Sequence, residues 1–191
     1  MPASADPNRP MKLVILDRDG VVNFDSDQYI KSPSEWKPIP GSLEAIARLN
    51  QAGFRVVLAT NQSGLGRGLF DMATLNAIHD KMHKLLAQHG ARIDALFFCP
   101  HAADANCDCR KPKPGMFEEI ARRFNLANLE GVPAVGDSLR DLLAAVELGA
   151  QPILVRSGKG ERTLAAGGLP PNTLIFADLA EAVDYLTAKA A

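Results

Sequence analysis

Cysteine and long hydrophobic runs are what this sequence has least of. Its 191 residues include 3 cysteines, which cannot all pair within one chain, so a disulfide scaffold is not expected and reduced thiols are the default. No apolar run approaches the roughly 18 residues of a membrane-spanning helix. The first ten residues also lack the apolar segment of a signal peptide. We therefore expect a cytoplasmic protein with no membrane partner.

An excess of charge of one sign is missing as well. The 21 Lys and Arg residues nearly balance the 22 Asp and Glu residues, giving a net charge of −1. Nucleic-acid-binding domains usually carry a basic face, so no nucleic acid is expected as a partner. The 47% of hydrophobic residues is enough for one domain with a real core at this length. We expect residues 1–11 to be a flexible tail and residues 12–191 to be a single domain.

Short apolar runs alternate with helical periodicity along the chain. The runs expected as strands are residues 12–16, 55–59, 95–99, 133–136, 152–155 and 173–176. Between them, apolar residues recur at helical spacing, as at Leu139, Leu142, Leu143 and Val146. This alternation predicts an α/β protein with a doubly wound, mainly parallel sheet. The two long connections, before residue 42 and between residues 99 and 114, are too short to form a separate cap domain.

Polar residues follow four of the expected strands. They are Asp17 and Asp19 after the first, residues 60–63 after the second, Arg110 and Lys111 at the start of a helix after the third and its loop, and residues 137–141 after the fourth. Because the carboxyl ends of parallel strands meet at one edge, these groups should converge. Singly, each could be a turn residue, a solvated lysine or a helix cap. Together they supply a carboxylate nucleophile, a hydroxyl, a cation and a further carboxylate, which suits phosphoryl transfer.

All three cysteines lie in one segment beside a histidine. This segment offers Cys99, His101, Cys107 and Cys109 as ligands, and three thiolates with one imidazole suit tetrahedral zinc. Three unrelated cysteines are the alternative, and a disulfide between Cys107 and Cys109 is geometrically awkward. Four protein ligands leave no open coordination position, so we expect a structural zinc that fixes the loop leading into Lys111.

Two further histidines, His79 and His83, stand four residues apart on the longest expected helix. The spacing would allow both to bind one metal ion. No carboxylate or cysteine partner is evident for them, so we expect ordinary packing and place neither histidine in the site.

The four polar motifs resemble those of the haloacid dehalogenase superfamily of phosphotransferases. The matching residues are Asp17-x-Asp19-Gly20, Thr60-Asn61, Lys111-Pro112 and Gly136-Asp137-x-x-x-Asp141. More narrowly, residues 17–20, 60–64 and 107–112 resemble the D-glycero-D-manno-heptose 1,7-bisphosphate phosphatases and the related histidinol-phosphate phosphatases. The resemblance runs from residue 12 to about residue 160 and implies a Rossmann-like fold with a zinc-binding loop.

The resemblance also implies a magnesium-dependent phosphatase that works through an aspartyl-phosphate. Asp17 would attack phosphorus, and Asp19 would protonate the leaving alcohol and then activate water. Thr60 and Lys111 would bind the transferring phosphoryl group, with Asp141 orienting Lys111 or a metal-bound water. Mg²⁺ would be held by Asp17, the backbone carbonyl of Asp19, and Asp137. The expected substrate contacts are Asp25, Asp27, Gln28, Asn61, Gln62, Ser63, Arg110 and Ser138.

The substrate is the least determined part of this reading. A heptose bisphosphate, which belongs to lipopolysaccharide-precursor synthesis, needs positive charge for its second phosphate. The candidates are Arg67, Arg110, Arg140, Arg156 and Lys159, and they favour this substrate. Histidinol phosphate would need acidic groups for its amine, for which Asp25 and Asp27 could serve. Ser138 stands where heptose bisphosphatases often carry lysine, so one contact is missing or supplied by another residue.

A different class of protein remains as an alternative. Signalling receiver domains also use a phosphorylated aspartate with a threonine and a lysine, but they need neither Asp19 nor a metal loop. We expect instead an enzyme for a small phosphorylated metabolite, acting as a monomer.

Overall fold

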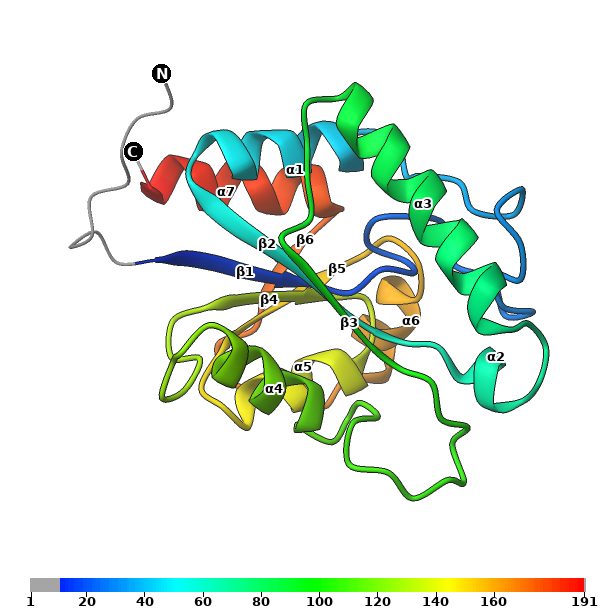
Figure 1. The fold of residues 1–191 in the computed structure, drawn as a ribbon. Helices are drawn as coiled ribbons and strands as arrows, with labels where there is room; N and C mark the ends of the chain where they lie inside the picture. Colours follow the sequence, from blue (N-terminus) through cyan, green and yellow to red (C-terminus); the bar gives the residue numbers. More distant parts are fainter. Residues whose placement is uncertain (1–10, 191) are drawn as a thin grey trace.

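The computed structural model describes residues 11–190 and has a six-stranded parallel sheet between two layers of helices (Figure 1). The strands are β1 (Lys12–Leu16), β2 (Phe54–Asn61), β3 (Ala95–Cys99), β4 (Pro133–Gly136), β5 (Gln151–Val155) and β6 (Leu174–Phe176). Their order is β3-β2-β1-β4-β5-β6, and every neighbouring pair is parallel. The expected α/β class is confirmed. The proposed tail lies, except for Met11, outside the described residues.

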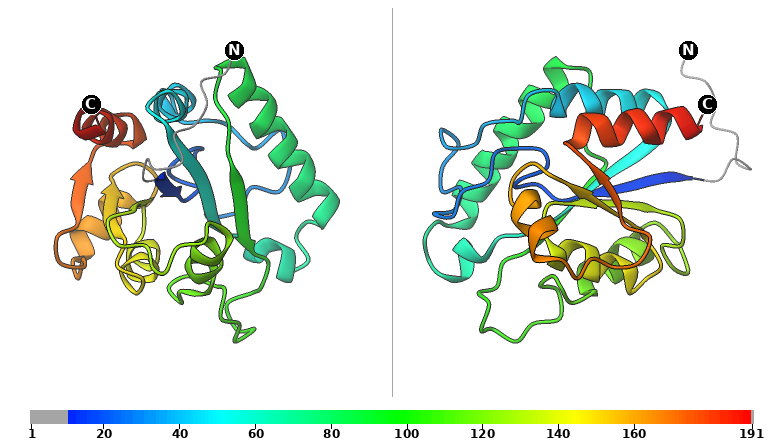
Figure 2. Two further views of the ribbon diagram at one scale, coloured as in Figure 1. Left: turned by 60° about the vertical axis from the view of Figure 1, so that its left-hand side comes forward. Right: turned by 180° about the vertical axis from the view of Figure 1, so that it is seen from behind.

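Helices cover both faces of this sheet. They are α1 (Ser42–Gln51), α2 (Ser63–Gly66), α3 (Met72–Gln88), α4 (Gly115–Arg123), α5 (Leu139–Val146), α6 (Gly160–Ala166) and α7 (Leu179–Ala190). Helices α1, α3 and α7 lie over one face, and α4 and α5 lie over the other (Figure 2). Within residues 11–190, no helix is both long and apolar enough to cross a membrane.

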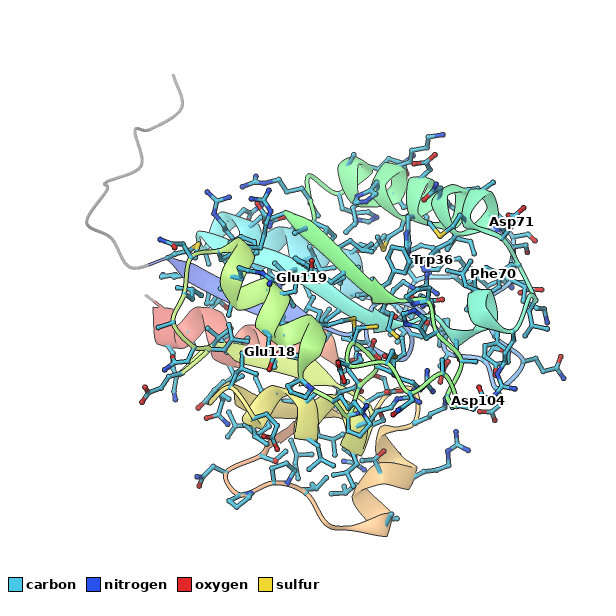
Figure 3. All side chains as sticks on the ribbon, turned by 60° about the horizontal axis from the view of Figure 1, so that its bottom comes forward. Trp36, Phe70, Asp71, Asp104, Glu118 and Glu119 are labelled. Atoms are coloured by element: carbon cyan, nitrogen blue, oxygen red, sulfur yellow. The ribbon has the colours of Figure 1, made fainter. Side chains whose placement is uncertain are left out.

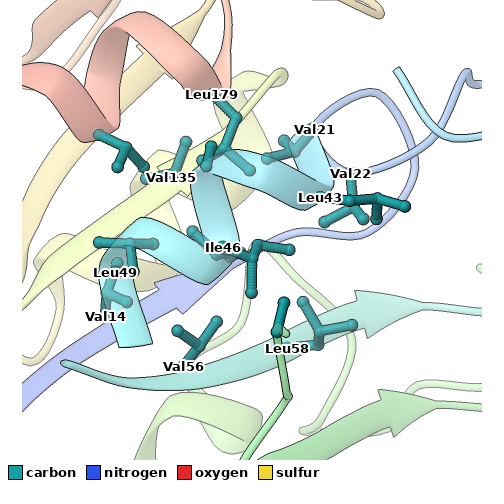
Figure 4. Packing of buried hydrophobic residues seen from close by; sticks show 14 of the residues in the cluster. Val14, Val21, Val22, Leu43, Ile46, Leu49, Val56, Leu58, Val135 and Leu179 are labelled. Atoms are coloured by element: carbon teal, nitrogen blue, oxygen red, sulfur yellow. The ribbon is translucent and has the colours of Figure 1, made fainter. Parts of the chain in front are cut away.

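Successive side chains of the buried strands point to opposite faces of the sheet and so contribute to two separate halves of the core. Val14 and Leu16 of β1 pack with α1 on one side, while Leu13 and Ile15 pack with α4 and α5 on the other. Figure 4 shows α1 resting on β1 and β2 in the first of these clusters. Since all four side chains are at most 2% exposed, β1 is buried on both faces. This explains why its sequence is continuously apolar and does not alternate with polar residues.

The strand order places the carboxyl end of β1 at the reversal point of the sheet. From β1 the chain proceeds to β2 and β3 on one side, and it then returns to β4 on the other side. Leu16 is in register with Leu58 of β2 and with Val135 of β4, so β1 and β4 end close together while β2 runs on to Asn61. Ligands of doubly wound sheets bind in the crevice at such a point. The convergence expected from the sequence is therefore confirmed.

Three local expectations differ from the structure. Lys111 does not open a helix, because α4 begins only at Gly115 and residues 110–114 form turns. Leu143, which has helical spacing with core residues, is 38% exposed. Helices α2 and α6 were not expected, since 4 and 7 residues are too few for a clear apolar period.

Candidate active site

A buried lysine joins two of the motifs at the end of β1. The ammonium of Lys111 lies 3.0 Å from Oδ1 of Asp17 and 2.7 Å from Oδ1 of Asp141, and it donates to the carbonyl of Ala59 at 2.7 Å. Its side chain is only 1% exposed. The two carboxylates hold the pKa of Lys111 above its ordinary value against the effect of burial. The alternative of a solvated lysine is therefore wrong.

Three carboxylates crowd together around this lysine. The side chains of Asp17, Asp137 and Asp141 are buried and offer oxygens that all lie within 4.8 Å of one another. Burial raises the pKa of Asp17 to about 6, although the Lys111 ammonium opposes the rise. Burial, with the charges of Asp17 and Asp141, raises the pKa of Asp137 to about 8. Hard oxygen ligands with uncompensated negative charge fit a bound Mg²⁺.

Two glycines make room for Asp137 at the centre of this cluster. A Cβ atom on Gly20 would lie 2.0 Å from Oδ2 of Asp137, and one on Gly158 would lie 2.3 Å from the same atom. Both glycines have positive φ, at +86° and +57°. The amide of Lys159 donates to this Oδ2 at 2.8 Å. The backbone of the loop after β5 therefore lies directly against the Asp137 carboxylate. Gly20 is required both for the turn after β1 and for the space that this carboxylate occupies.

Asp141 has two partners among the described residues, Ser138 and Lys111. It forms a capping box with Ser138 at the start of α5, in which the backbone N–H and hydroxyl of Ser138 donate to Oδ2 of Asp141 at 3.0 and 2.7 Å. Its Oδ1 faces Lys111. Burial works against the charged form, but Lys111 and Arg140 keep the pKa of Asp141 below its usual value. Ser138 is thus the helix cap, and the alternative that Asp137 caps this helix is wrong.

Asp19 is held apart from the carboxylate cluster by a ring of donors. Arg18 donates through Nε and Nη2, while the side-chain amides of Asn23 and Gln62 donate to Oδ1 and Oδ2 at 2.8 and 2.9 Å. Although burial works against the charged form, these donors lower the pKa of Asp19. The two aspartates after β1 therefore have opposite environments, one crowded with like charge and one saturated with donors.

The end of β2 supplies polar groups that organise the site. Nε2 of Gln62 donates both to Asp19 and to Oγ1 of Thr60. The side-chain amide of Asn61 donates to the carbonyl of Lys111 and accepts from its N–H, both at 3.1 Å. Asn61 thus clamps the backbone that carries the buried ammonium. Ser63 opens the short helix α2.

A pocket opens above these groups. Of the expected site residues, Asp17, Asp19, Asp25, Thr60, Asn61, Gln62 and Lys111 line it together with Arg140 and Lys159. Three other expected contacts are not among the described residues that line this pocket: Ser63, Arg110 and Ser138. Asp27 and Gln28 are exposed on the rim, where Gln28 borders a second, shallower hollow. The structure therefore brings together the expected catalytic residues but only some of the expected substrate contacts.

Charge at the pocket mouth is partly compensated. The ammonium of Lys159 lies 2.8 Å from Oδ2 of Asp25. Arg140 lines the same pocket, and within residues 11–190 no carboxylate forms an ion pair with it; its Nε is buried without a hydrogen-bond partner. Arg156, by contrast, is exposed and paired with Glu161 at 2.7 Å. Arg140 is thus a cation at the pocket with no direct ion pair among the described residues, although the charges of Asp141 and Asp17 act on it.

The second candidate site is the loop between β3 and α4. Sγ of Cys99 lies 3.6 Å from Sγ of Cys107 and 3.0 Å from Sγ of Cys109, whose sulfur is 3.3 Å from Nδ1 of His101. Tetrahedral zinc with Zn–S bonds of about 2.3 Å places sulfurs about 3.8 Å apart, whereas a disulfide needs about 2.05 Å. Both sulfur–sulfur distances are too long for a disulfide, and the 3.6 Å distance is close to that of a zinc tetrahedron while the 3.0 Å distance is shorter. Asp104 marks the outer part of this loop in Figure 3.

The loop is fastened to its surroundings through two glycines. The N–H of Gly66 in α2 donates to the carbonyl of Pro100 at 2.8 Å, and the N–H of Gly115 in α4 donates to that of Asp108 at 3.1 Å. A Cβ on Gly66 or Gly115 would come within 2.6 or 2.4 Å of loop backbone. The cysteine–histidine cluster therefore lies between two helices and directly precedes Lys111.

Sequence reasoning missed the residues that surround Asp19, which are Arg18, Asn23 and, behind Arg18, His79. His79 of α3 is buried, with its Nε2 3.0 Å from Nη1 of Arg18. The expectation of packing is confirmed, but His79 packs against a residue that holds Asp19. No sequence signal could have found this contact, since the two residues are 61 positions apart and lie on a strand end and a helix.

Comparisons with known proteins agree with this geometry. Residues 12–140 match the family model described as polynucleotide kinase 3 phosphatase, and residues 108–182 match the HAD-hydrolase-like model. A D-glycero-beta-D-manno-heptose-1,7-bisphosphate 7-phosphatase of Bordetella bronchiseptica is 63% identical, covering 94% of this chain and 100% of the relative. One of Pseudomonas putida is 57% identical, covering 89% and 96%.

A solved structure gives the same result. The D,D-heptose 1,7-bisphosphate phosphatase of B. bronchiseptica, crystallised with magnesium and phosphate, superposes with a TM-score of 0.92 at 63% identity, covering 94% of this chain and 99% of that one. A second heptose bisphosphate phosphatase, from Burkholderia thailandensis, has a TM-score of 0.73 at 55% identity, covering 92% and 98%.

Proposed function

Because this chain belongs to the haloacid dehalogenase superfamily and, within it, to the family of the D-glycero-D-manno-heptose 1,7-bisphosphate 7-phosphatases, we propose that it removes the 7-phosphate of that sugar. It is a phosphoric monoester hydrolase. The observation that carries the proposal is the buried contact between Lys111 and Asp17 at the reversal point of the sheet. It places a fixed cation beside a carboxylate where a phosphoryl group would enter.

Two aspartates divide the chemistry. An oxygen of Asp17 forms a bond to phosphorus while the bond to the sugar oxygen breaks, and the leaving oxygen takes a proton from Asp19. Asp19 then accepts a proton from the water that attacks the phosphorus of the aspartyl-phosphate, which releases inorganic phosphate and restores Asp17. Thr60 and Lys111 bind the oxygens of the transferring group. Both carboxyls line the same pocket as Thr60 and Lys111, which supports this division.

The carboxylate cluster is the proposed magnesium site. Asp17, Asp137 and the backbone carbonyl of Asp19 would hold the ion, and Asp141 would remain with Lys111. Bound Mg²⁺ would supply positive charge that offsets charge on the phosphoryl oxygens. The raised pKa values of Asp17 and Asp137 support a cation site, since their charges lack compensation from protein groups alone.

The cysteine–histidine cluster is the proposed zinc site. With Cys99, His101, Cys107 and Cys109 all engaged, it has no open position, so its role would be structural. Burial and the neighbouring thiols raise the pKa of Cys109 to about 12, and a cation would offset this cost of forming thiolates. The zinc would hold the loop that carries Arg110 and Lys111.

A cation at the pocket with no direct ion pair among the described residues favours a bisphosphate substrate. We assign the non-reacting phosphate to Arg140, which would take the place of the missing lysine at Ser138. Lys159 lines the same pocket but is paired with Asp25, and Arg110 is not part of the pocket wall. Histidinol phosphate would need free acidic groups, yet Asp25 is neutralised by Lys159. Asp25, Asp27 and Gln28 would then contact sugar hydroxyls through the rim. Asn61 and Gln62 would border the reacting phosphate, whereas Ser63 opens α2 outside the pocket wall.

The test is phosphate release with Mg²⁺ on both anomers of the heptose bisphosphate, histidinol phosphate and fructose 1,6-bisphosphate. We expect the heptose bisphosphate to have the highest kcat/KM, with the β anomer preferred. Dominant turnover of histidinol phosphate would overturn the substrate and keep the chemistry. A stable aspartyl-phosphate without turnover would instead indicate a signalling receiver.

The remaining expectations complete the proposal. The even charge balance favours a small phosphorylated metabolite over nucleic acid. We propose that the enzyme acts as a monomer. A role in lipopolysaccharide-precursor synthesis would place the enzyme in the cytoplasm.

A further inference from the structure

Arg18 is a fully buried cation near the site that forms no ion pair with the carboxylate cluster of Asp17, Asp137 and Asp141. Arg18 stands between the two aspartates in the chain, and its side chain is 0% exposed. Its Nε and Nη2 donate to Asp19 at 2.9 to 3.1 Å, covering both carboxylate oxygens. A fork of this kind fixes both the place and the plane of a carboxyl group. The position of Asp19 therefore depends on what holds the guanidinium.

The other end of the guanidinium rests on helix α3. Nη1 of Arg18 lies 3.0 Å from Nε2 of His79, which is 8% exposed. Since an arginine has only donors, Nε2 must be the acceptor, and the ring is neutral with its proton on Nδ1. Burial, with the charge of Arg18, lowers the pKa of His79 to about 3, which agrees with a neutral ring. The acceptor is thus present over the whole physiological range.

We propose that His79 is a positioning residue for the proton carrier: by accepting from Arg18, it fixes the guanidinium that holds the Asp19 carboxyl. The proposal rests on the proposed role of Asp19. It also gives α3 a function, since this helix contributes no group to the wall of the pocket among the described residues.

Loss of the acceptor has a defined consequence. Without it, Nη1 is a buried donor with no partner, and the guanidinium shifts to find one. Asn23 and Gln62 still donate to Asp19, so the carboxyl is displaced and not released. A displaced proton carrier slows the departure of a sugar alcohol, which needs a proton, more than that of p-nitrophenolate, which does not.

The experiment compares kcat/KM for these two kinds of leaving group. The variants are His79→Leu, which removes the acceptor, and His79→Gln, whose Oε1 can replace Nε2. His83→Leu, an exposed position one turn further along α3, is the matched control. The substrates are p-nitrophenyl phosphate and whichever sugar or alkyl phosphate the wild type uses best, and melting temperatures check folding. Should His79→Leu not fold, His79→Met takes its place.

For His79→Leu we expect kcat/KM for the alkyl phosphate to fall about tenfold more than that for p-nitrophenyl phosphate. His79→Gln should restore the ratio of the two, and His83→Leu should not change it. Equal losses on both substrates, or a ratio that His79→Gln fails to restore, would overturn the positioning role. A wild type that releases phosphate from neither substrate would overturn the proposed function instead, so the two failures are distinguishable.

Discussion

The two candidate metal sites of this protein are built in opposite ways. The carboxylate cluster takes Asp17 and Asp137 from the ends of two neighbouring strands, with Asp141 from the helix that follows, and the sheet places them. The cysteine–histidine cluster takes Cys99 from the end of β3 and its other three ligands from the loop that follows, which has no strand or helix of its own. The first site has its shape without a cation but carries unbalanced charge. The second has its ligands close together, and we expect it to depend on a metal for rigidity.

This difference shows what each ion would contribute. In the carboxylate cluster a cation relieves repulsion among buried groups, so its binding energy is electrostatic. In the loop a cation replaces the hydrophobic core that a short irregular segment cannot form. The two sites meet at Lys111, whose ammonium belongs to the first and whose backbone follows the second. Substitutions at either site should therefore lower the rate of phosphate release, but they should differ in their effect on the stability of the folded protein.

The largest expected effect separates chemistry from folding. In Asp17→Asn the nucleophile is lost while the buried contact to Lys111 keeps a hydrogen-bonding group, so kcat should fall about a thousandfold or more. The melting temperature in EDTA should not decrease, because one of the crowded charges is gone. Phosphate release and thermal unfolding of the same preparation measure both. Near-normal turnover of Asp17→Asn would remove Asp17 from the mechanism.

Breaking the loop should cost both activity and stability. Cys109→Ser removes one ligand, so we expect zinc content to fall, proteolysis within residues 99–113 to speed up, and kcat to fall about a hundredfold as Lys111 loses its place. Metal analysis, limited proteolysis and kinetics provide the measurements. Asp104→Ala, on the same loop but outside the ligand set, is the control and should behave as the wild type. A metal-free Cys109→Ser enzyme with full activity would show that the loop does not aim Lys111.

The carboxylate cluster should respond to pH in a way the loop does not. Asp137 has a folded pKa raised from 3.8 to about 8, so between these values the folded state binds more protons than the unfolded state. In EDTA, stability should therefore decrease as pH rises from 4 to 8. Asp137→Asn should flatten this slope and be more stable than the wild type at pH 8, by about 1 kcal/mol or more.

Adding Mg²⁺ should reverse the order of stability, because only the wild type retains the full ligand set. Denaturant unfolding at several pH values tests both parts. If the free energy of unfolding in EDTA fell with pH equally steeply in Asp137→Asn and in the wild type, protein groups would already balance the charge of Asp137 in the folded state.

The smallest expected effect concerns the substrate. Arg140→Gln should raise KM for the heptose bisphosphate about tenfold, since a charged contact to the second phosphate is lost. KM for the corresponding 7-monophosphate should change much less. Arg156→Gln, which removes an exposed arginine already paired with Glu161, is the matched control. Equal changes for both substrates would assign Arg140 to general electrostatics and not to the second phosphate.

Much of the fold and of the catalytic edge could be predicted from the sequence. Buried parallel strands read as continuous apolar runs, and their ends are marked where Leu16 gives way to Asp17 and Val135 to Gly136 and Asp137. The topology of such sheets then brings these ends together without further information. The cysteine cluster was equally readable, because its ligands are neighbours in the chain.

The features that could not be predicted depend on contacts between distant segments. Ser138 was expected at the substrate, but its hydroxyl is committed to Asp141 as a helix cap. Asn61 holds the backbone of Lys111, and His79 reaches the end of β1 through Arg18. None of these has a periodicity or a motif. Each depends on how a loop or helix settles against the sheet, which the sequence specifies only through tertiary packing.

The most direct test of this account is to trap the phosphorylated enzyme. Wild-type protein with Mg²⁺ is mixed with the heptose bisphosphate, quenched in acid within a single turnover, digested and mapped by mass spectrometry. The account predicts a phosphate on the peptide that contains Asp17, attached to that residue and absent from Asp17→Asn. Turnover without any phosphorylated peptide, or a phosphate on another residue, would contradict it.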